Sequence, residues 1–253
     1  MQQPYPILEY DAAVEAMIMP GGYPKVDMPE HCVICFFRDV VNHFVDRGVL
    51  TQIIALTSEM GEHPVYVRQY GDQRVALLQQ GVGAPLAVGL LEETISLGAR
   101  KFIACGGAGV LDRTIAIGHL LVPTAAVRDE GTSYHYLPPA RAVEPTPAAV
   151  QAIETVLKRH QVDYLLTKTW TTDAFYRETK AKVALRRAEG CLAVEMEAAA
   201  MFAVAQFRNV QLGQILYGGD NLDSEKWDSR DWNKKWTVRE KLIELAIEAC
   251  LEL

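Results

Sequence analysis

Two acids stand at the junction of an apolar strand and an alanine-rich helix, in the segment CLAVEMEAAA (191–200). Glu195 and Glu197 flank Met196 there, and a carboxylate in so apolar a stretch is costly unless a partner satisfies it. The carboxyl end of a strand beside a helix N-terminus is where open α/β sheets usually bind ligands. Acids in the first turn also favour the helix dipole, so the pattern leaves ligand binding and helix stabilisation both open.

A further acid, Asp220, follows an apolar run in the segment LYGGDNLD (216–223). Turn formation is the ordinary role of Gly, Asp and Asn in such a pattern. The alternative is that Asp220 lies at a strand end, faces the same site as Glu197 and acts there as a general acid.

The segment TWTTDAFYRET (169–179) gathers aromatic side chains at a predicted strand-to-helix turn. Aromatic rings are natural stacking partners for a flat heterocycle, which makes Trp170 and Phe175 candidate ligand contacts. The other interpretation is structural, with Phe175 in the core and Asp173 as a helix N-cap.

A glycine-rich segment, ACGGAGV (104–110), follows the apolar run KFIAC. The backbone amides of Gly106 and Gly107 could form a nest for phosphate, because glycine lets a backbone approach an anion closely. The segment matches neither GxGxxG nor a P-loop, so a tight turn with close packing is equally open. Further along, His135 is a candidate acid or base in a loop that could instead be structural or lie between subunits.

The elements that must position these residues are apolar strands alternating with helices. Several strands are apolar throughout, as strands covered on both faces should be. The order predicts an α/β fold, a three-layer αβα sandwich around a largely parallel or mixed central β-sheet, in one domain over residues 1–253. The predicted strands are 32–37, 52–56, 64–68, 74–79, 101–105, 118–127, 163–170, 191–196 and 211–217, and the predicted helices are 85–97, 147–160, 176–189, 196–208 and 235–252.

The composition is that of an ordinary soluble globular protein, with 49% hydrophobic and 23% charged residues among 253. A net charge of −7 argues against non-specific nucleic-acid binding, which needs a basic face. No apolar run approaches the roughly 20 residues that span a bilayer, and no secretory signal is visible at the N-terminus. We therefore expect a cytoplasmic protein with no nucleic-acid or membrane partner.

Cys32 and Cys35 form a C-x-x-C pair, a spacing that can serve metal or redox chemistry. They lie in the predicted strand 32–37, where residues three apart point to opposite faces. No second Cys/His pair at ligand spacing accompanies them. We therefore expect core thiols in a reducing compartment and no metal site.

Taken together, these segments resemble the nucleoside phosphorylase family, which holds purine nucleoside phosphorylases, uridine phosphorylases and related nucleosidases. The matching stretches cover roughly residues 50 to 225 in the order found in the family, and VEMEAAA is the most specific of them. The resemblance implies a central mixed sheet of the phosphorylase/hydrolase type and a homodimer or an assembly of dimers. The stretches are GVGAP (81–85), ACGGAGV, IGHLLVPTAAVRDEGTSYHY (117–136), TTDAFYRET (171–179), VEMEAAA (194–200) and GGDN (218–221).

The resemblance also assigns roles to individual residues. Met196 should pack under the ribose, Glu197 should accept hydrogen bonds from its hydroxyls, and Phe175 should stack on the base. Asp220 matches the acid that protonates the base in the purine-cleaving branch, and pyrimidines lack the imidazole nitrogen that it would serve. The remaining substrate contacts implied at these motifs are Glu195, Trp170 and Arg177.

The phosphate side departs from the family pattern. Phosphorolytic members bind phosphate with arginines, one of them at the start of the glycine-rich loop, where this chain has Ala104 and Cys105. The hydroxyl residue usual in that loop is replaced by Gly107, which together with Gly106 and Arg38 is the candidate phosphate site.

The leading hypothesis is phosphorolysis of a nucleoside, purine favoured, to free base and ribose 1-phosphate in purine salvage. This reaction needs no metal or cofactor, and inorganic phosphate is its co-substrate. A nucleoside hydrolase on the same scaffold is the alternative; the missing arginines favour it, and Glu59 or Glu62 would have to activate the water. A nucleoside-binding module without catalysis is the third hypothesis.

Overall fold

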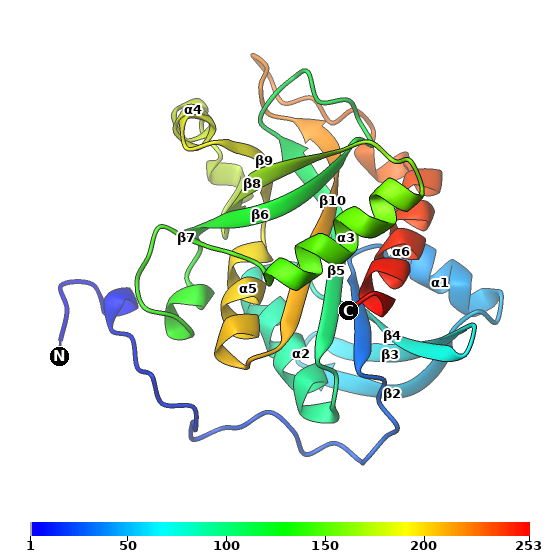
Figure 1. Ribbon diagram of the computed structural model, residues 1–253. Helices are drawn as coiled ribbons and strands as arrows, with labels where there is room; N and C mark the ends of the chain where they lie inside the picture. The colour runs from blue at the N-terminus through cyan, green and yellow to red at the C-terminus, as the bar shows by residue number, and fades with distance from the viewer. Residues whose placement is uncertain (1) are drawn as a thin grey trace.

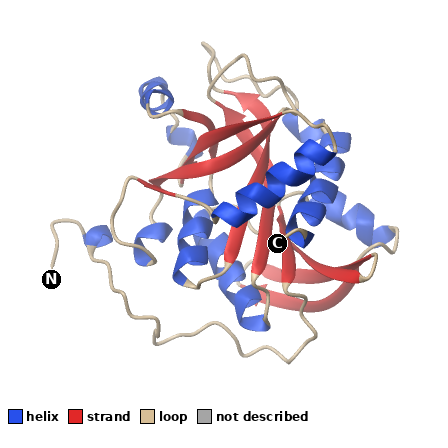
Figure 2. Ribbon diagram, viewed as in Figure 1, coloured by secondary structure: helices blue, strands red, loops and turns tan. Residues whose placement is uncertain are grey.

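The computed structural model describes residues 2–253, and these build a mixed sheet of ten strands with helices on both faces (Figures 1 and 2). This arrangement confirms the predicted α/β fold with a central mixed sheet. The strands are β1 (His31–Cys35), β2 (Thr51–Ser58), β3 (Gly61–Tyr70), β4 (Gln73–Gln79), β5 (Lys101–Val110), β6 (Leu120–Asp129), β7 (Ala142–Val143), β8 (Tyr164–Thr172), β9 (Cys191–Glu195) and β10 (Gln211–Asn221).

The helices divide between the two faces of the sheet, and each set closes its own apolar cluster. One face is covered by α1 (Arg38–Asp46), α3 (Pro147–Arg159) and α6 (Trp236–Leu251). The other is covered by α2 (Ala84–Leu97) and α5 (Ala198–Phe207), while α4 (Lys180–Ala188) packs beside β9.

Cys32 and Cys35 belong to different clusters on opposite faces of β1, so the expected alternation along this strand is confirmed. All five cysteines are free and buried. Residues 2–253 contain no group of His, Cys, Asp and Glu placed to hold a metal ion. In the same range, no helix combines the length and apolarity needed to cross a membrane.

Five strands pair in a closed ring, because β5 and β10 pair with each other and are also joined through β6, β8 and β9. The order of the strands in the sheet is β10-β6-β8-β9-β5-β1-β4-β3-β2, and β10 also pairs with β5. The ring places the ends of β8, β9 and β10 close to one another, and the candidate site residues follow or lie at those ends.

Three local predictions need correction. The strand predicted to end at residue 105 continues through the glycines to Val110, so ACGGAGV is not a turn. The predicted helix 176–189 is two elements, a 3-10 turn η3 (Phe175–Arg177) and α4, whose N-cap is Thr179 rather than Asp173. Helix α1 was not predicted; it starts directly after β1 without a side-chain N-cap and buries Val40, Val41 and Phe44.

Candidate active site

Glu195 ends β9 and holds the first turn of α5. Its Oε2 accepts hydrogen bonds from the backbone N–H groups of Glu197 at 2.7 Å and Ala198 at 2.6 Å, and its Oε1 accepts one from the Thr171 hydroxyl at 2.6 Å. Burial raises the pKa of Glu195 to about 7, although these hydrogen bonds oppose the shift. Both oxygens are thus engaged by the protein, and Glu195 is the acid that satisfies the helix N-terminus.

Glu197 occupies the N-cap position of α5 but does not cap that helix. Its Oε1 instead accepts a hydrogen bond from the backbone N–H of Gly83 at 2.6 Å. Gly83 has φ +94°, a conformation that favours glycine, and it lies in the loop that leads from β4 into α2. Burial, and then the charge on Glu195, raise the pKa of Glu197 to about 8. Met196 lies between these two buried acids and is itself partly exposed.

Two more acids extend this group. Asp173 follows β8, and its Oδ2 accepts a hydrogen bond from Gly131 N–H at 2.8 Å. Glu130 follows β6, is buried, and accepts a hydrogen bond from the backbone N–H of Ser133 at 2.9 Å. Burial, and then the nearby charge of Asp173, raise the pKa of Glu130, and the same charge contributes to the raised pKa of Glu197. Carboxyl groups from the ends of β6, β8 and β9 therefore converge, and the sequence offered no sign of Glu130.

Asp220 lies near the end of β10, which pairs with β5 and β6. Its Oδ1 is 3.4 Å from the Cβ position that a side chain at Gly109 would occupy, and Val194 Cγ1 is 3.0 Å from the same point. Its Oδ2 accepts a hydrogen bond from the indole Nε1 of Trp227 at 2.6 Å. Asp220 and Val194, which is on the strand that leads into Met196 and Glu197, therefore flank the same glycine of β5.

The connection between β8 and α4 runs from the acids around Glu197 to Asp220. Asp173, at its start, is close to Glu197. Glu178, near its end, is beside Asp220: burial, and then the charge on Asp220, raise the pKa of Glu178 to about 7. Phe175 lies between them in the sequence, with its side chain 50% exposed and its ring centroid 4.1 Å from that of Tyr176. Arg177 is exposed on the same turn.

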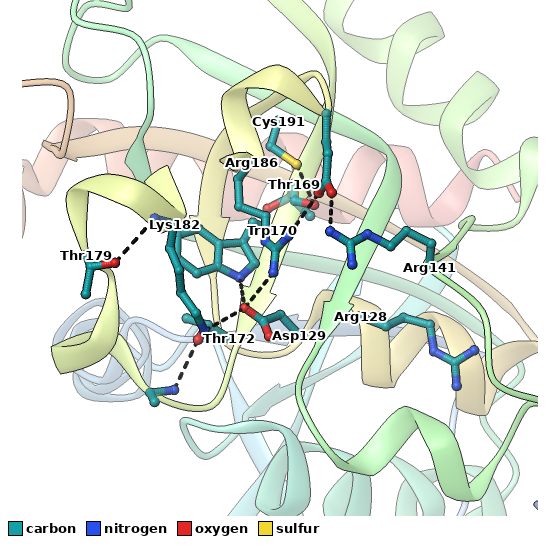
Figure 3. A network of polar contacts seen from close by, with 12 residues as sticks. Arg128, Asp129, Arg141, Thr169, Trp170, Thr172, Thr179, Lys182, Arg186 and Cys191 are labelled. Atoms are coloured by element: carbon teal, nitrogen blue, oxygen red, sulfur yellow. Dashed lines mark hydrogen bonds and ion pairs between the residues drawn. The ribbon is translucent and has the colours of Figure 1, made fainter. Parts of the chain in front are cut away.

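Trp170 does not join this group. Its side chain is fully buried, and its indole Nε1 donates a hydrogen bond to Asp129 Oδ2 at 2.9 Å (Figure 3). Lys182 and Arg186 lie over the ring at 5.9 and 5.4 Å from its centroid. No face of the indole is open to a base, so the prediction that Trp170 contacts substrate is not supported.

Asp129 is the centre of the network that fixes α4 and therefore the end of the β8–α4 connection (Figure 3). Its Oδ2 also accepts from Arg186 at 2.9 Å and Lys182 at 3.1 Å. Burial acts to raise the pKa of Asp129, but these hydrogen bonds outweigh it and the pKa lies below its ordinary value. The guanidinium of Arg186 is almost completely buried, with 6% of its side chain exposed.

We expect Asp129→Ala to lower the free energy of unfolding by about 2–4 kcal/mol, because it leaves the buried Arg186 charge without its main partner. Urea unfolding followed by circular dichroism measures this loss. Asp163→Ala, at an exposed acid, is the control and should change stability by less than about 0.5 kcal/mol. Equal effects of the two substitutions would contradict the role given to Asp129.

On the predicted phosphate side, the glycines are covered by apolar groups. A Cβ at Gly106 would lie 3.2 Å from the Phe36 ring, and one at Gly107 would lie 3.2 Å from the Tyr217 ring. Arg38 is exposed at the start of α1. Arg68, on β3, donates a hydrogen bond to Glu244 on α6 at 2.6 Å.

Comparison with known proteins identifies the family. The family model of the phosphorylase superfamily matches residues 30–252. A guanosine phosphorylase of Halorubrum lacusprofundi is 26% identical over 221 residues, 87% of this chain and 84% of its own, and a uridine phosphorylase of Treponema pallidum is 30% identical over 61% of this chain and 64% of its own. The crystal structure of a uridine phosphorylase from Vibrio fischeri superposes with a TM-score of 0.75 at 25% identity, covering 90% of this chain and 94% of that one. The chain therefore belongs to the phosphorylase superfamily and is an enzyme of the nucleoside phosphorylase family.

Proposed function

We propose that this enzyme cleaves the N-glycosidic bond of a nucleoside, purine favoured, with inorganic phosphate as the acceptor, giving free base and ribose 1-phosphate. The observation that carries the proposal is the β8–α4 connection. It lies beside Glu197 at Asp173 and beside Asp220 at Glu178, with the exposed Phe175 between. A nucleoside with its sugar on Met196 and Glu197 and its base on Phe175 would lie along this connection, with the base directed to the end that holds Asp220.

The charges that develop in the reaction fit an arrangement with acids at both the sugar end and the base end of the site. The ribose gains positive charge as the bond breaks, and carboxyl groups at the sugar end stabilise it. The base gains negative charge and needs a proton from an acid at the other end. The acids around Glu197 and the acid Asp220 are placed to serve these opposite ends.

The preference for purines rests on Asp220. A purine has an imidazole nitrogen that can take a proton while the glycosidic bond breaks, and a pyrimidine has none. The relatives include both a guanosine and a uridine phosphorylase, so the preference is drawn from the acid and not from the relatives.

The proposal extends to the cellular setting and to assembly. An enzyme that returns free purine bases acts in nucleoside salvage in the cytoplasm, and five free thiols fit a reducing compartment. A homodimer or an assembly of dimers is supported by apolar side chains exposed near the site, with Val82 67% and Tyr176 89% exposed.

A second candidate function is hydrolysis, with water in place of phosphate. The observation that favours it is the packing of Phe36 and Tyr217 against Gly106 and Gly107, where a phosphate would need cationic or amide partners. Glu59 and Glu62, considered as water activators from the sequence, are exposed on the β2–β3 hairpin.

A nucleoside panel, incubated with and without phosphate, separates these functions. We expect inosine or guanosine to release free base only with phosphate present, and ³¹P NMR to show ribose 1-phosphate. Phosphate-independent release of free ribose would establish the hydrolase instead. No base release from any purine or pyrimidine nucleoside would contradict both functions.

A further inference from the structure

Trp227 covers the acid that we place at the base end of the site. Its indole Nε1 donates a hydrogen bond to Asp220 Oδ2 at 2.6 Å. The other carboxylate oxygen, Oδ1, lies against β5, 3.4 Å from the Cβ position that a side chain at Gly109 would occupy. Oδ1 therefore faces the sheet, and Oδ2 faces the loop after β10, where the indole holds it.

The loop after β10 is fixed at two points. Near its start, Asp223 accepts a hydrogen bond from the guanidinium of Arg187 on α4 at 2.6 Å. Further along, Asp228 pairs with Asn221 through the backbone, and the N–H of Asn221 donates to the carbonyl of Asp228 at 2.8 Å. The tip of the loop, residues 224–227, lies between these attachments, so it can move while both of them stay in place.

The hydrogen bond to Asp220 is the main restraint on the indole. Trp227 is 66% exposed, so packing does little to hold its side chain. A hydrogen bond at the protein surface contributes little net free energy, because water replaces it when it breaks. The indole can therefore leave the carboxylate at a small cost.

The indole also presents to Asp220 the group that a released purine would present. Indole is a planar bicyclic heterocycle with an N–H in its five-membered ring, and a purine protonated at its imidazole nitrogen has the same form. In both, the N–H lies in the plane of the rings and points outward as a donor. A purine that takes its proton from Oδ2 of Asp220 therefore ends with its N–H where the Nε1 of Trp227 lies, and the two ring systems cannot share that position.

We propose that Trp227 is a gate, whose indole closes the base end of the site until a purine base displaces it from Asp220. The inference rests on the proposed function, because it takes Asp220 as the acid at that end. Residues 224–227 are the moving part, and the indole N–H competes with the base for the same carboxylate oxygen. The closed form lowers the apparent affinity for the base, since only molecules with the indole displaced can bind it.

The first test measures the binding of hypoxanthine to the wild type and to Trp227→Phe by calorimetry. Phenylalanine keeps an aromatic ring but has no N–H, so the variant cannot hold the closed form. We expect it to bind hypoxanthine about fivefold or more tightly than the wild type, whereas the loss of a merely structural residue would weaken binding. Trp236→Phe, at an exposed tryptophan at the start of α6, is the control and should bind like the wild type. Equal affinities of the wild type and Trp227→Phe, or no binding to either, would overturn the gate.

Kinetics with two substrates separate the gate from proton donation. Nitrophenolate leaves without a proton, so 4-nitrophenyl β-D-riboside does not need the acid function of Asp220. Its leaving group still has to enter the space that the indole holds. In Trp227→Phe, kcat/KM should therefore rise about fivefold or more for both inosine and the nitrophenyl riboside. An unchanged or lower kcat/KM on both substrates would overturn the gate while leaving the proposed function intact.

A third measurement follows the indole without turnover. In a ¹⁵N NMR spectrum, the indole N–H resonance of Trp227 is the one that Trp227→Phe removes. Saturating hypoxanthine should shift this resonance to the position of an indole in contact with water, while the resonance of Trp236 stays in place. A Trp227 resonance that bound hypoxanthine does not move would overturn the gate. The expected shift would support the gate even if the enzyme released no base from any nucleoside.

Discussion

Replacing Glu197 by glutamine is expected to lower kcat/KM for nucleoside cleavage by about 10²- to 10³-fold while the protein stays folded. Glutamine keeps the shape of the side chain and an oxygen that can accept from Gly83. It cannot become the anion that Glu197 forms as pH rises through about 8, so in that range it binds the ribose hydroxyls less strongly as positive charge grows on the sugar. Steady-state kinetics with a purine nucleoside measure the loss.

The stability of the same variant provides a check on folding. The pKa of Glu197 is raised to about 8, so between about pH 4.5 and 8 the folded protein keeps a proton that the unfolded chain has lost. The contribution of Glu197 to wild-type stability therefore falls as pH rises through this window. Glu197→Gln removes that contribution, and its unfolding free energy should fall less steeply with pH, with the remaining slope partly due to Glu195.

Glu144→Gln, at an exposed acid distant from the motif in sequence, is the matched control and should leave both activity and the pH slope unchanged. If Glu197→Gln kept near-normal activity, the ribose role would be wrong. If it lost activity only because it unfolded, thermal melts at pH 6 and pH 8 would show a lower melting temperature than the wild type at both.

The junction that holds Glu195 and Glu197 was predictable because its signal is local. A strand, two acids and a helix within ten residues place Glu195 and Glu197 at one junction, and the apolar surroundings make them conspicuous. The sequence left ligand binding and helix capping open for this pair. In the structure Glu195 accepts hydrogen bonds from the helix N–H groups, whereas Glu197 accepts one from the backbone N–H of Gly83, 114 residues away.

Other features depended on contacts that local patterns do not contain. Trp170 has the composition of a stacking residue, but Asp129, Lys182 and Arg186 converge on it from separate elements and enclose it. The glycines of ACGGAGV have the composition of a turn, yet they lie in a strand because Phe36 and Tyr217 pack where side chains would be. Glu178 carried no local signal, since its pKa is raised by burial and by the charge on Asp220 of another strand, which lies 42 residues further along the chain.

The second large effect is expected from Asp220→Asn, which should lower kcat/KM for purine nucleosides by about 10²- to 10⁴-fold. Asparagine matches aspartate in shape, and its carbonyl oxygen can still accept from the Trp227 indole, so the loop should keep its place. Asparagine has no carboxylic acid proton that it can transfer to the base. Because the loss concerns the leaving group alone, cleavage of uridine and of 4-nitrophenyl β-D-riboside should fall far less.

Parallel kinetics on inosine, uridine and the nitrophenyl riboside therefore separate acid catalysis from simple damage to the site. Asp228→Asn, on the same loop but more exposed, should leave all three rates close to wild type. Equal losses of Asp220→Asn on all three substrates would remove the general-acid role and the argument for purines together, since both depend on a proton reaching the base from this end of the site.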